Sequence, residues 1–199
     1  MIHRYKPFSE ACEENEAPIR AVLATYLADA RTLLEIGSGT GQHAVAFAAA
    51  FPGLTWQTSD VADNLPGIRL WIAEAGLPNL PPPLELDVTG TWPDGRYDAV
   101  FSANTAHIMS EEQVEAMLRG VPRVLAPGGI LALYGPFNYG GGYTSESNAR
   151  FDRWLKARDP ASGIKDFETL DALAQEGGLA LARDHAMPVN NRTLVWRLD

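Results

Sequence analysis

Residues 33–47, LLEIGSGTGQHAVAF, contain the feature that decides the fold of this chain. Apolar residues run up to Ile36, glycines alternate at Gly37, Gly39 and Gly41, and an alanine-rich segment follows. This order predicts a buried strand that turns sharply through a glycine loop into a helix. Because glycine lets the backbone approach a ligand where a side chain would collide, the loop is a candidate binding site.

The glycine loop matches two patterns that imply different cofactors. Gly39, Gly41 and Ala44 give G-x-G-x-x-A, a form of the dinucleotide-binding fingerprint. Glu35 and the three alternating glycines give E-x-G-x-G-x-G instead. The loop alone leaves both patterns open, so the rest of the chain has to discriminate between them.

The composition excludes several classes of protein. With 199 residues, of which 46% are hydrophobic, the chain is long enough for one well-buried domain. The formal net charge of −9 argues against a nucleic-acid partner, because phosphate binding needs a basic surface. Cys12 is the single cysteine, which leaves no intrachain disulfide, and we expect no metal site. No signal peptide and no run of about 20 apolar residues is evident, so we expect a soluble, cytoplasmic protein without a membrane partner.

Apolar runs alternate with helical segments over the first two thirds of the chain. This alternation predicts a parallel sheet with helices on both faces, in three α/β/α layers. The predicted strands are 33–36, 54–60, 82–88, 96–104 and 130–135, and the predicted helices are 9–28, 42–51, 64–75 and 111–125.

The C-terminal part follows a different pattern. Residues 179–188 and 193–199 predict two strands, and Asn190 and Asn191 between them suit the positive φ of a tight antiparallel hairpin. We therefore expect a Rossmann-like, doubly wound, seven-stranded sheet with an antiparallel C-terminal hairpin that gives the sheet one antiparallel edge.

No linker or repeat divides the chain, so residues 1–199 are predicted to form a single domain. Residues 1–30 are expected to form an N-terminal helical cap. Residues 136–176, which begin with a glycine- and tyrosine-rich loop, are expected to form a substrate-side insertion.

Polar residues stand where the predicted strands end. Asp60 ends the second strand, Asp87 the third and Asn104 the fourth. In open parallel sheets a ligand lies beyond the carboxyl ends of the strands, where the strand order reverses. An acid in the position of Asp60 is suited to hydrogen-bond two ribose hydroxyls. These residues and the glycine loop are therefore expected to form one ligand site.

Three observations favour the pattern that includes Glu35. A carboxylate inside an apolar strand is costly without partners, and a cationic ligand or loop amides would supply them. The dinucleotide pattern leaves Gly37 without a role. The C-terminal hairpin also replaces the sixth parallel strand with which dinucleotide folds usually continue.

Several motifs together resemble those of the class I S-adenosylmethionine-dependent methyltransferases. They are LLEIGSGTGQHA (33–44), Asp60, LDV (86–88), YDAVFSANTAHI (97–108) and VLAPGGILALYGPF (124–137). More narrowly, YGPF, SNARFD, RDPASGIKD, MPVNNRTLVW and ENEAPI resemble a poorly characterised bacterial and eukaryotic methyltransferase-like family, a domain of unknown function.

The resemblance implies a role for each matching residue in binding S-adenosylmethionine, with S-adenosylhomocysteine as the product. Asp60 binds the ribose, and the nearby Asp63 is an alternative for that role. Glu35, Gly37, Gly39 and Gly41 surround the methionine part, Asp87 and Val88 contact the adenine, and Asn104 lines the sulfonium end.

The acceptor is expected to be a small molecule held beyond the sulfonium. His107 is the candidate general base, and the alternative is a histidine packed at the start of a helix. Tyr134 is a second catalytic candidate, and it begins an aromatic segment to Tyr143 that forms either a lid hinged at Gly140–Gly142 or a surface loop. Tyr5 and Asn15 are expected to close the pocket from the N-terminal side, whereas His43 is expected to be solvated or to cap a helix.

Three functional hypotheses follow. The first is an S-adenosylmethionine-dependent methyltransferase that acts on a small molecule. The second is a catalytically weak protein that binds this cofactor and acts with a partner. The third is an NAD(P)-dependent oxidoreductase. Binding of the two kinds of cofactor discriminates the third from the others, and turnover discriminates the first from the second.

Overall fold

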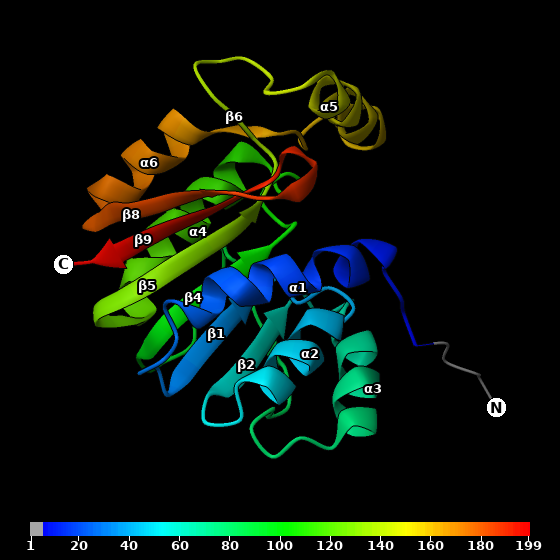
Figure 1. Ribbon diagram of the computed structural model, residues 1–199, viewed down its shortest axis with the longest axis vertical. Coiled ribbons are helices and arrows are strands. Elements are labelled where there is room, and N and C mark those ends of the chain that lie inside the picture. Colours follow the sequence, from blue (N-terminus) through cyan, green and yellow to red (C-terminus); the bar gives the residue numbers. More distant parts are fainter. Residues whose placement is uncertain (1–5) are drawn as a thin grey trace.

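The computed structural model describes residues 6–199, which form a three-layer α/β/α domain (Figure 1). The seven strands of the main sheet follow the order β3-β2-β1-β4-β5-β9-β8. Their bounds are β1 Thr32–Ile36, β2 Thr55–Asp60, β3 Leu84–Glu85, β4 Tyr97–Ala103, β5 Leu125–Gly135, β8 Leu179–Ala186 and β9 Arg192–Leu198. The short strands β6 (Phe137–Asn138) and β7 (Lys165–Asp166) pair separately from this sheet.

Helices cover both faces of the sheet. On one face α1 and α2 pack their buried apolar residues, such as Ile19 and Phe47, against Leu33, Trp56 and Phe101 of the strands. On the opposite face α4 and α6 cover the strand residues whose side chains point to the other side of the sheet. The helix bounds are α1 Glu10–Ala24, α2 Gln42–Ala50, α3 Leu65–Ala75, α4 Glu111–Val124, α5 Glu146–Arg158 and α6 Phe167–Glu176, with a 3-10 turn η1 at Pro188–Asn190.

The sheet confirms the predicted fold class. Strands β1 to β5 pair in parallel, and the C-terminal strands β8 and β9 form an antiparallel hairpin. The predicted antiparallel edge is confirmed, because the last strand in the sheet, β8, pairs antiparallel with β9. Strand β9 itself inserts between β5 and β8 and pairs antiparallel with both. Strand β8 is therefore the edge, and it runs parallel to β5.

Two strands differ in length from the prediction. Strand β3 is only Leu84–Glu85, because Pro81–Pro83 provide no N–H groups for a longer ladder. Strand β5 begins at Leu125, directly after α4, so it starts earlier than the predicted strand 130–135, and its pairing with β4 has an irregularity near its start.

The hairpin turn between β8 and β9 has positive φ at Val189 (58°) and Asn190 (59°). The prediction of positive φ at Asn190 and Asn191 is therefore shifted by one residue, since Asn191 has φ −88°. The turn is closed by the Asn191 N–H, which donates to the Pro188 carbonyl at 3.3 Å. Positive φ at two central residues defines a type I′ turn, which normally favours glycine or asparagine at both places.

Strand order reverses at β1, which lies between β2 and β4. The glycine loop follows β1, so it lies at the point where such sheets bind their ligands. No helix within residues 6–199 is both long and apolar enough to cross a membrane.

Candidate functional site

The three alternating glycines of the loop after β1 all have positive φ, but only two of them are closely packed. A Cβ on Gly37 would lie 2.6 Å from Cγ2 of Thr105, and one on Gly41 would lie 3.2 Å from Cα of Ile68 in α3. These two positions require glycine so that the loop can pack against its neighbours. A Cβ on Gly39 would meet nothing within 4 Å, so this residue presents bare backbone to open space.

Asp60, at the end of β2, connects that strand to the glycine loop. Its Oδ2 accepts a hydrogen bond from the Gly39 N–H at 2.7 Å. Its Oδ1 accepts from the Val61 N–H at 2.8 Å and from the Asn64 amide at 2.9 Å. Because a carboxylate can accept about four hydrogen bonds, Oδ2 keeps capacity for a ligand hydroxyl. Asp63 is exposed and stands outside this arrangement.

Glu35 is fully buried at the end of β1, and its partners differ from those expected. Its Oε2 accepts from the Ser38 hydroxyl at 2.8 Å and from the Trp56 indole N–H at 3.0 Å. Neither partner is a loop amide. Burial raises the pKa of Glu35 to about 7, although both hydrogen bonds act in the opposite direction. The carboxyl group is thus poised to change charge near neutral pH.

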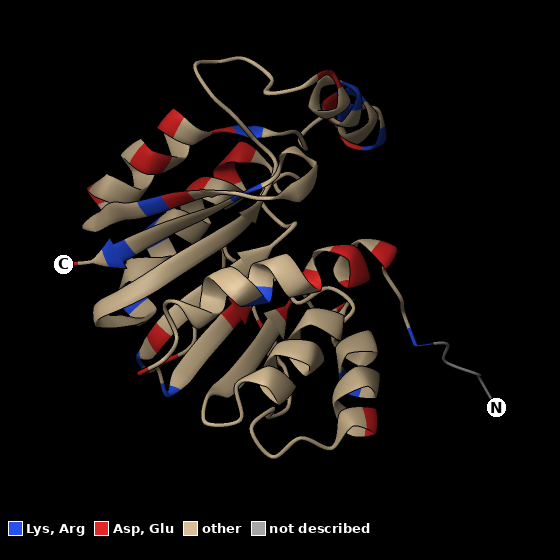
Figure 2. Cartoon of the chain, in the orientation of Figure 1, with Lys and Arg blue, Asp and Glu red and all other residues tan. Residues whose placement is uncertain are grey.

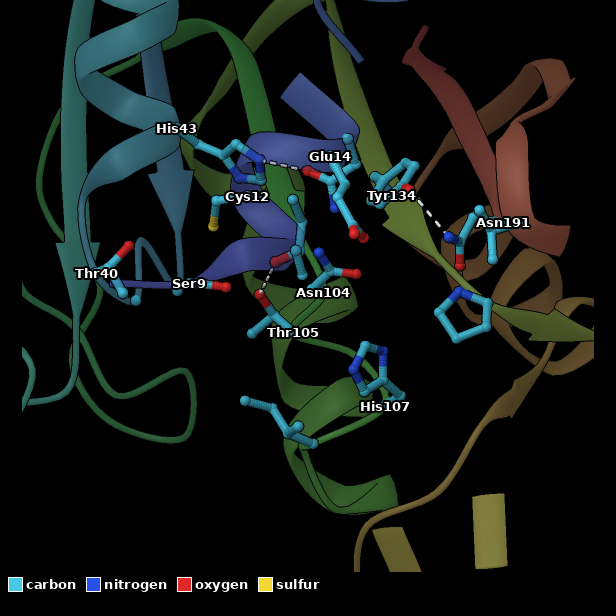
Figure 3. A pocket seen from close by; sticks show the side chains of 18 of the residues that line it. Ser9, Cys12, Glu14, Thr40, His43, Asn104, Thr105, His107, Tyr134 and Asn191 are labelled. Atoms are coloured by element: carbon cyan, nitrogen blue, oxygen red, sulfur yellow. Dashed lines mark hydrogen bonds between the residues drawn. The ribbon is translucent and has the colours of Figure 1, made fainter. Parts of the chain in front are cut away.

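The glycine loop, Glu35 and Asp60 line a cavity of about 520 Å³ at the carboxyl ends of the strands. Other walls come from α1, the loop after β4, α5 and the turn η1. Figure 3 shows Glu14, Asn104 and His107 around this space. The cavity lining contains no lysine or arginine within residues 6–199, and its carboxylates are Glu14, Glu35 and Asp60.

Asn104 follows β4 directly and lines the same cavity as Gly37. Its φ of 57° is unusual for a residue other than glycine, and its N–H donates to the Tyr134 carbonyl at 2.9 Å. Such backbone strain often occurs at functional sites, where surrounding structure holds it in place. The backbone of Asn104, the residue predicted to line the sulfonium end, is therefore held in one conformation in the cavity wall.

His107 lies three residues further on, with 7% of its surface exposed, and lines the same cavity. Its ring makes an edge contact with Phe151 of α5, with centroids 5.2 Å apart. Within the described chain neither ring nitrogen has a hydrogen-bond partner. Burial lowers the pKa of His107 to about 4, and the charge of Lys165 adds to this effect. The imidazole is therefore neutral and able to accept a proton at ordinary pH.

His43 is also buried, so the expectation that it is solvated or caps a helix is wrong. Its Nε2 lies 2.7 Å from Oδ1 of Asn15, and its ring stacks on Phe47. Burial lowers the pKa of His43 to about 4. Asn15 lines the cavity as expected, whereas Tyr5 lies outside the described residues. Both side chains of this pair line the cavity, and the hydrogen bond between them links α1 to α2.

Tyr134 is almost fully buried near the end of β5 and reaches the cavity. Its hydroxyl accepts a hydrogen bond from the Asn191 amide at 3.0 Å. Burial raises the pKa of the Tyr134 phenol, which is only partly offset by hydrogen bonds from Asn191 and Asn15. The phenol therefore stays protonated at neutral pH and can donate, but not accept, a proton.

Asp87 and Val88 follow β3 and do not belong to the cavity lining. The exposed Asp87 carboxylate accepts from the N–H and hydroxyl of Thr89, which lowers its pKa. Val88 is buried, and its carbonyl accepts from the Trp92 indole. The segment still borders the site, because the Leu86 N–H donates to the Asp60 carbonyl at 2.9 Å.

The aromatic segment from Tyr134 to Tyr143 is organised differently from a lid. Of its aromatic residues only Tyr134 lines the cavity, since Tyr139 stacks on Phe167 and Tyr143 donates to Asp152 at 2.7 Å. Residues 140–142 form an exposed tight turn, which two backbone hydrogen bonds between Tyr139 and Gly142 close. The open side of the cavity is bordered instead by α5 and the turn η1, through Ser147, Asn148, Phe151, Pro188, Val189 and Asn191.

Sequence patterns gave no functional signal for several residues of the cavity wall. Glu14, Phe151 and Val189 stand on three separate segments, and only the tertiary fold brings them together. Asn64 is different, because its position four residues after Asp60 at the start of α3 provided a local signal. No cluster of three or more histidine, cysteine, aspartate or glutamate side chains that could hold a metal ion occurs within residues 6–199.

Comparison with known proteins shows the family and the fold of the chain. Residues 6–198 match the family described as "Protein of unknown function (DUF938)", and the chain belongs to this family. The fold is that of the class I S-adenosylmethionine-dependent methyltransferases.

Three similar solved structures illustrate that fold. An O-methyltransferase family protein from Burkholderia thailandensis has a TM-score of 0.84 at 17% identity, over 96% of this chain and 58% of its own. The mitomycin 7-O-methyltransferase has a TM-score of 0.80 at 22% identity, over 94% and 54%. Human N-acetylserotonin methyltransferase, solved in complex with S-adenosylmethionine, has a TM-score of 0.78 at 14% identity, over 95% and 53%. The chain therefore spans little more than half the length of these proteins.

Proposed function

We propose that this protein is an S-adenosylmethionine-dependent methyltransferase that acts on a small molecule. The observation that carries the proposal is the convergence, in one cavity, of a bare glycine backbone, two buried carboxylates and a neutral histidine without a hydrogen-bond partner. Cofactor-binding and acid–base groups would thus face the same enclosed space.

The cavity fits the cofactor in shape at the glycine loop. Gly39 leaves open the volume that a Cβ would fill, so Gly37 and Gly39 would cradle the methionine part with their backbone, and Gly41 would support the loop by packing against α3. Glu35 supports the loop from below through Ser38. The free acceptor capacity on Oδ2 of Asp60 would take a ribose hydroxyl.

The cavity also fits the cofactor in charge. Within residues 6–199 its lining contains three acidic side chains, Glu14, Glu35 and Asp60, and no lysine or arginine. Acidic residues also gather on the N-terminal half of α1, which borders the cavity (Figure 2). A ligand with a positively charged sulfonium would be favoured in this field, near Asn104, over the phosphates of a dinucleotide.

The adenine would lie further along the sheet, towards β3. Asp87 and Val88 would hold its edge, because their segment is hydrogen-bonded to Asp60 through Leu86. The Asp87 carboxylate retains its charge and is exposed, so it can accept from an amino group.

S-adenosylmethionine, when bound, supplies an electrophilic methyl group. The contribution of the chain would be to position the acceptor at about 3–3.5 Å and to exclude water. His107 would remove the proton from the attacking atom, since its neutral imidazole faces the cavity. Tyr134, which keeps its proton, would orient the acceptor by donating a hydrogen bond.

The two accessory segments would complete the site. Residues 1–30 would act as a helical cap, since α1 supplies the cavity wall at Glu14 and Asn15. Residues 136–176 would act as the substrate-side insertion, through α5 rather than through the turn at 140–142. Residues 1–199 would form a single domain.

Calorimetric titration with S-adenosylmethionine, S-adenosylhomocysteine and NAD(P)H tests the cofactor. We expect the first two to bind and the third not to bind. A screen for methyl transfer to pools of small metabolites then tests for turnover. Binding without transfer to any acceptor would favour a cofactor-binding protein that acts with a partner, and binding of NAD(P)H alone would favour an oxidoreductase.

A further inference from the structure

The turn η1 contains a conformational anomaly at the open side of the cavity. Val189 has φ 58° and ψ 37°, in the left-handed region that β-branched residues rarely adopt. It is also 79% exposed, so little packing within the protein compensates for the strain. The local fold would be better served by asparagine or glycine in this position of a type I′ turn. The stability of the fold therefore does not explain why valine occupies this position.

Val189 is one of three apolar side chains that border the cavity from different segments. Ile108, on the loop after β4, is 56% exposed, and Phe151 lies on α5. All three line the cavity that contains Asn104 and His107. Single exposed apolar residues are ordinary on protein surfaces, but convergence of three on one opening marks a contact for an apolar ligand. We call Ile108, Phe151 and Val189 the apolar lip.

The apolar lip is held in place before any ligand arrives. The Asn148 amide donates to the Asn190 carbonyl at 3.4 Å, which ties the turn to α5. The Asn191 amide donates to the Tyr134 hydroxyl at 3.0 Å, which ties the turn to β5. Phe151 is held against the His107 ring. A contact surface that is ordered in advance loses less conformational entropy on binding.

The charge around the lip restricts what it can bind. The cavity has no lysine or arginine side chain in its described lining, and Glu14 faces the same space. An acceptor with a carboxylate or phosphate would therefore meet repulsion without compensation. The apolar lip suits a molecule with an apolar body. The neutral imidazole of His107, beside the lip, suits a nucleophile of that molecule that carries a proton.

We infer that the apolar lip of Ile108, Phe151 and Val189 binds the apolar body of an acceptor without negative charge, and that Val189 is a specificity-determining residue. This inference rests on the proposed function, because it assigns the acceptor end of the same cavity. Binding of the acceptor at the lip places its nucleophile toward His107 and Asn104, deeper in the cavity. The contact of Val189 with the acceptor explains why a valine stands in this strained backbone conformation.

Fluorescence titration of the complex with S-adenosylhomocysteine tests the inference. The probes are prodan, an uncharged naphthalene dye, and anilinonaphthalene sulfonate, its anionic counterpart. We expect the complex to bind prodan, and the anionic dye more weakly. Val189→Asn should weaken prodan binding about tenfold, whereas Val189→Leu, which keeps the apolar contact, should retain it. Leu181→Asn is the matched control, because Leu181 is an exposed apolar residue outside the cavity, and it should not change prodan binding.

Two further measurements separate the possible failures. The ligand-free Val189→Asn protein should melt no earlier than the wild type, and earlier melting would mean that Val189 serves packing, which overturns the inference. Prodan binding that is absent in the wild-type complex, or unchanged in Val189→Asn, overturns it as well. S-adenosylhomocysteine should bind all variants equally. Failure of the wild type to bind it would refute the proposed function itself.

Discussion

The main-chain N–H of Gly39 donates a hydrogen bond of 2.7 Å to Oδ2 of Asp60, which joins the glycine loop to the end of β2. The backbone that would cradle the cofactor is thus held by the side chain that would bind its ribose. A single carboxylate therefore contributes both to the order of the loop and to ligand affinity.

Asp60→Ala should weaken binding of S-adenosylmethionine by about 1.5–3 kcal/mol, the range for a hydrogen bond to a charged group. The sequence alone predicts almost no change in stability, because the acid would face an empty cleft. The three protein donors on Asp60 indicate otherwise. Losing their acceptor should lower the free energy of unfolding by about 1–3 kcal/mol. Calorimetry measures the first effect and chemical denaturation the second.

Asp63→Ala is the control for this experiment. Asp63 is exposed and close in sequence, and it was the alternative for the ribose role. The substitution should change neither affinity nor stability. If Asp63→Ala weakens binding while Asp60→Ala does not, the ribose contact belongs to Asp63.

Gly39→Val should abolish binding of S-adenosylhomocysteine. The φ of 57° makes valine strained there by about 1–3 kcal/mol, and its side chain would project into the cavity. Gly76→Val provides a matched control, because Gly76 has φ 59° and likewise no atom within 4 Å of a built Cβ, but it ends α3 outside the cavity.

Both glycine variants should therefore lose similar stability, and only Gly39→Val should lose binding. Thermal denaturation and calorimetry on the same preparations measure the two effects. Equal affinity of the two variants would show that Gly39 does not form part of the cradle.

The cavity wall at the glycine loop and the strand ends could be predicted from the sequence because its signals are local, whereas Asp87 and Val88, also predicted for the cofactor, do not line the cavity. Glu35, Asp60 and Asn104 each stand at the end of a strand, and parallel strands bring their ends together at one edge of the sheet. The glycines after β1 mark the turn directly. Alternation of strands and helices was sufficient to predict the parallel part of the sheet, and two adjacent strand patterns predicted the C-terminal hairpin.

The acceptor half was not predictable because it depends on long-range packing. Tyr139 and Tyr143 have the aromatic character of a substrate loop, but Asp184 and Asp152 bind their hydroxyls away from the cavity. The predicted substrate-side insertion, residues 136–176, includes α5, but the sequence did not indicate that Phe151 on this helix would line the cavity in place of the tyrosines. The insertion of β9 between β5 and β8 likewise depends on which strands pair, and hydrophobic patterns do not specify that.

The stability contributed by Glu35 should depend on pH. Burial raises its pKa from 4.5 to about 7, so between these values the native state keeps a proton that the unfolded chain has lost. This contribution favours the fold fully below about pH 4.5, and it is lost as the pH rises through about 7. The free energy of unfolding of the wild type, relative to Glu35→Gln, should therefore fall between pH 5 and pH 8.

Urea denaturation of both proteins at several pH values measures this difference. Subtracting the variant removes the contributions of other titrating groups, including His43, whose lowered pKa has the opposite sign. A constant difference over this range would mean that Glu35 is ionised in the native state throughout.

His107→Asn should reduce kcat/KM for an acceptor found in the methyl-transfer screen by about 10²–10⁴-fold, the usual contribution of a general base. Affinity for S-adenosylhomocysteine should not change, because the imidazole would contact the acceptor. Only the neutral imidazole accepts a proton, and burial lowers its pKa to about 4. The acid limb of the wild-type pH profile of kcat/KM should therefore lie near pH 4.

His185→Asn is the control, because His185 on β8 bonds to Tyr26 outside the cavity, and it should retain turnover. Turnover of His107→Asn close to that of the wild type would exclude His107 as the base, and an acid limb near the ordinary pKa of 6.5 would mean that its environment in the working enzyme is solvated.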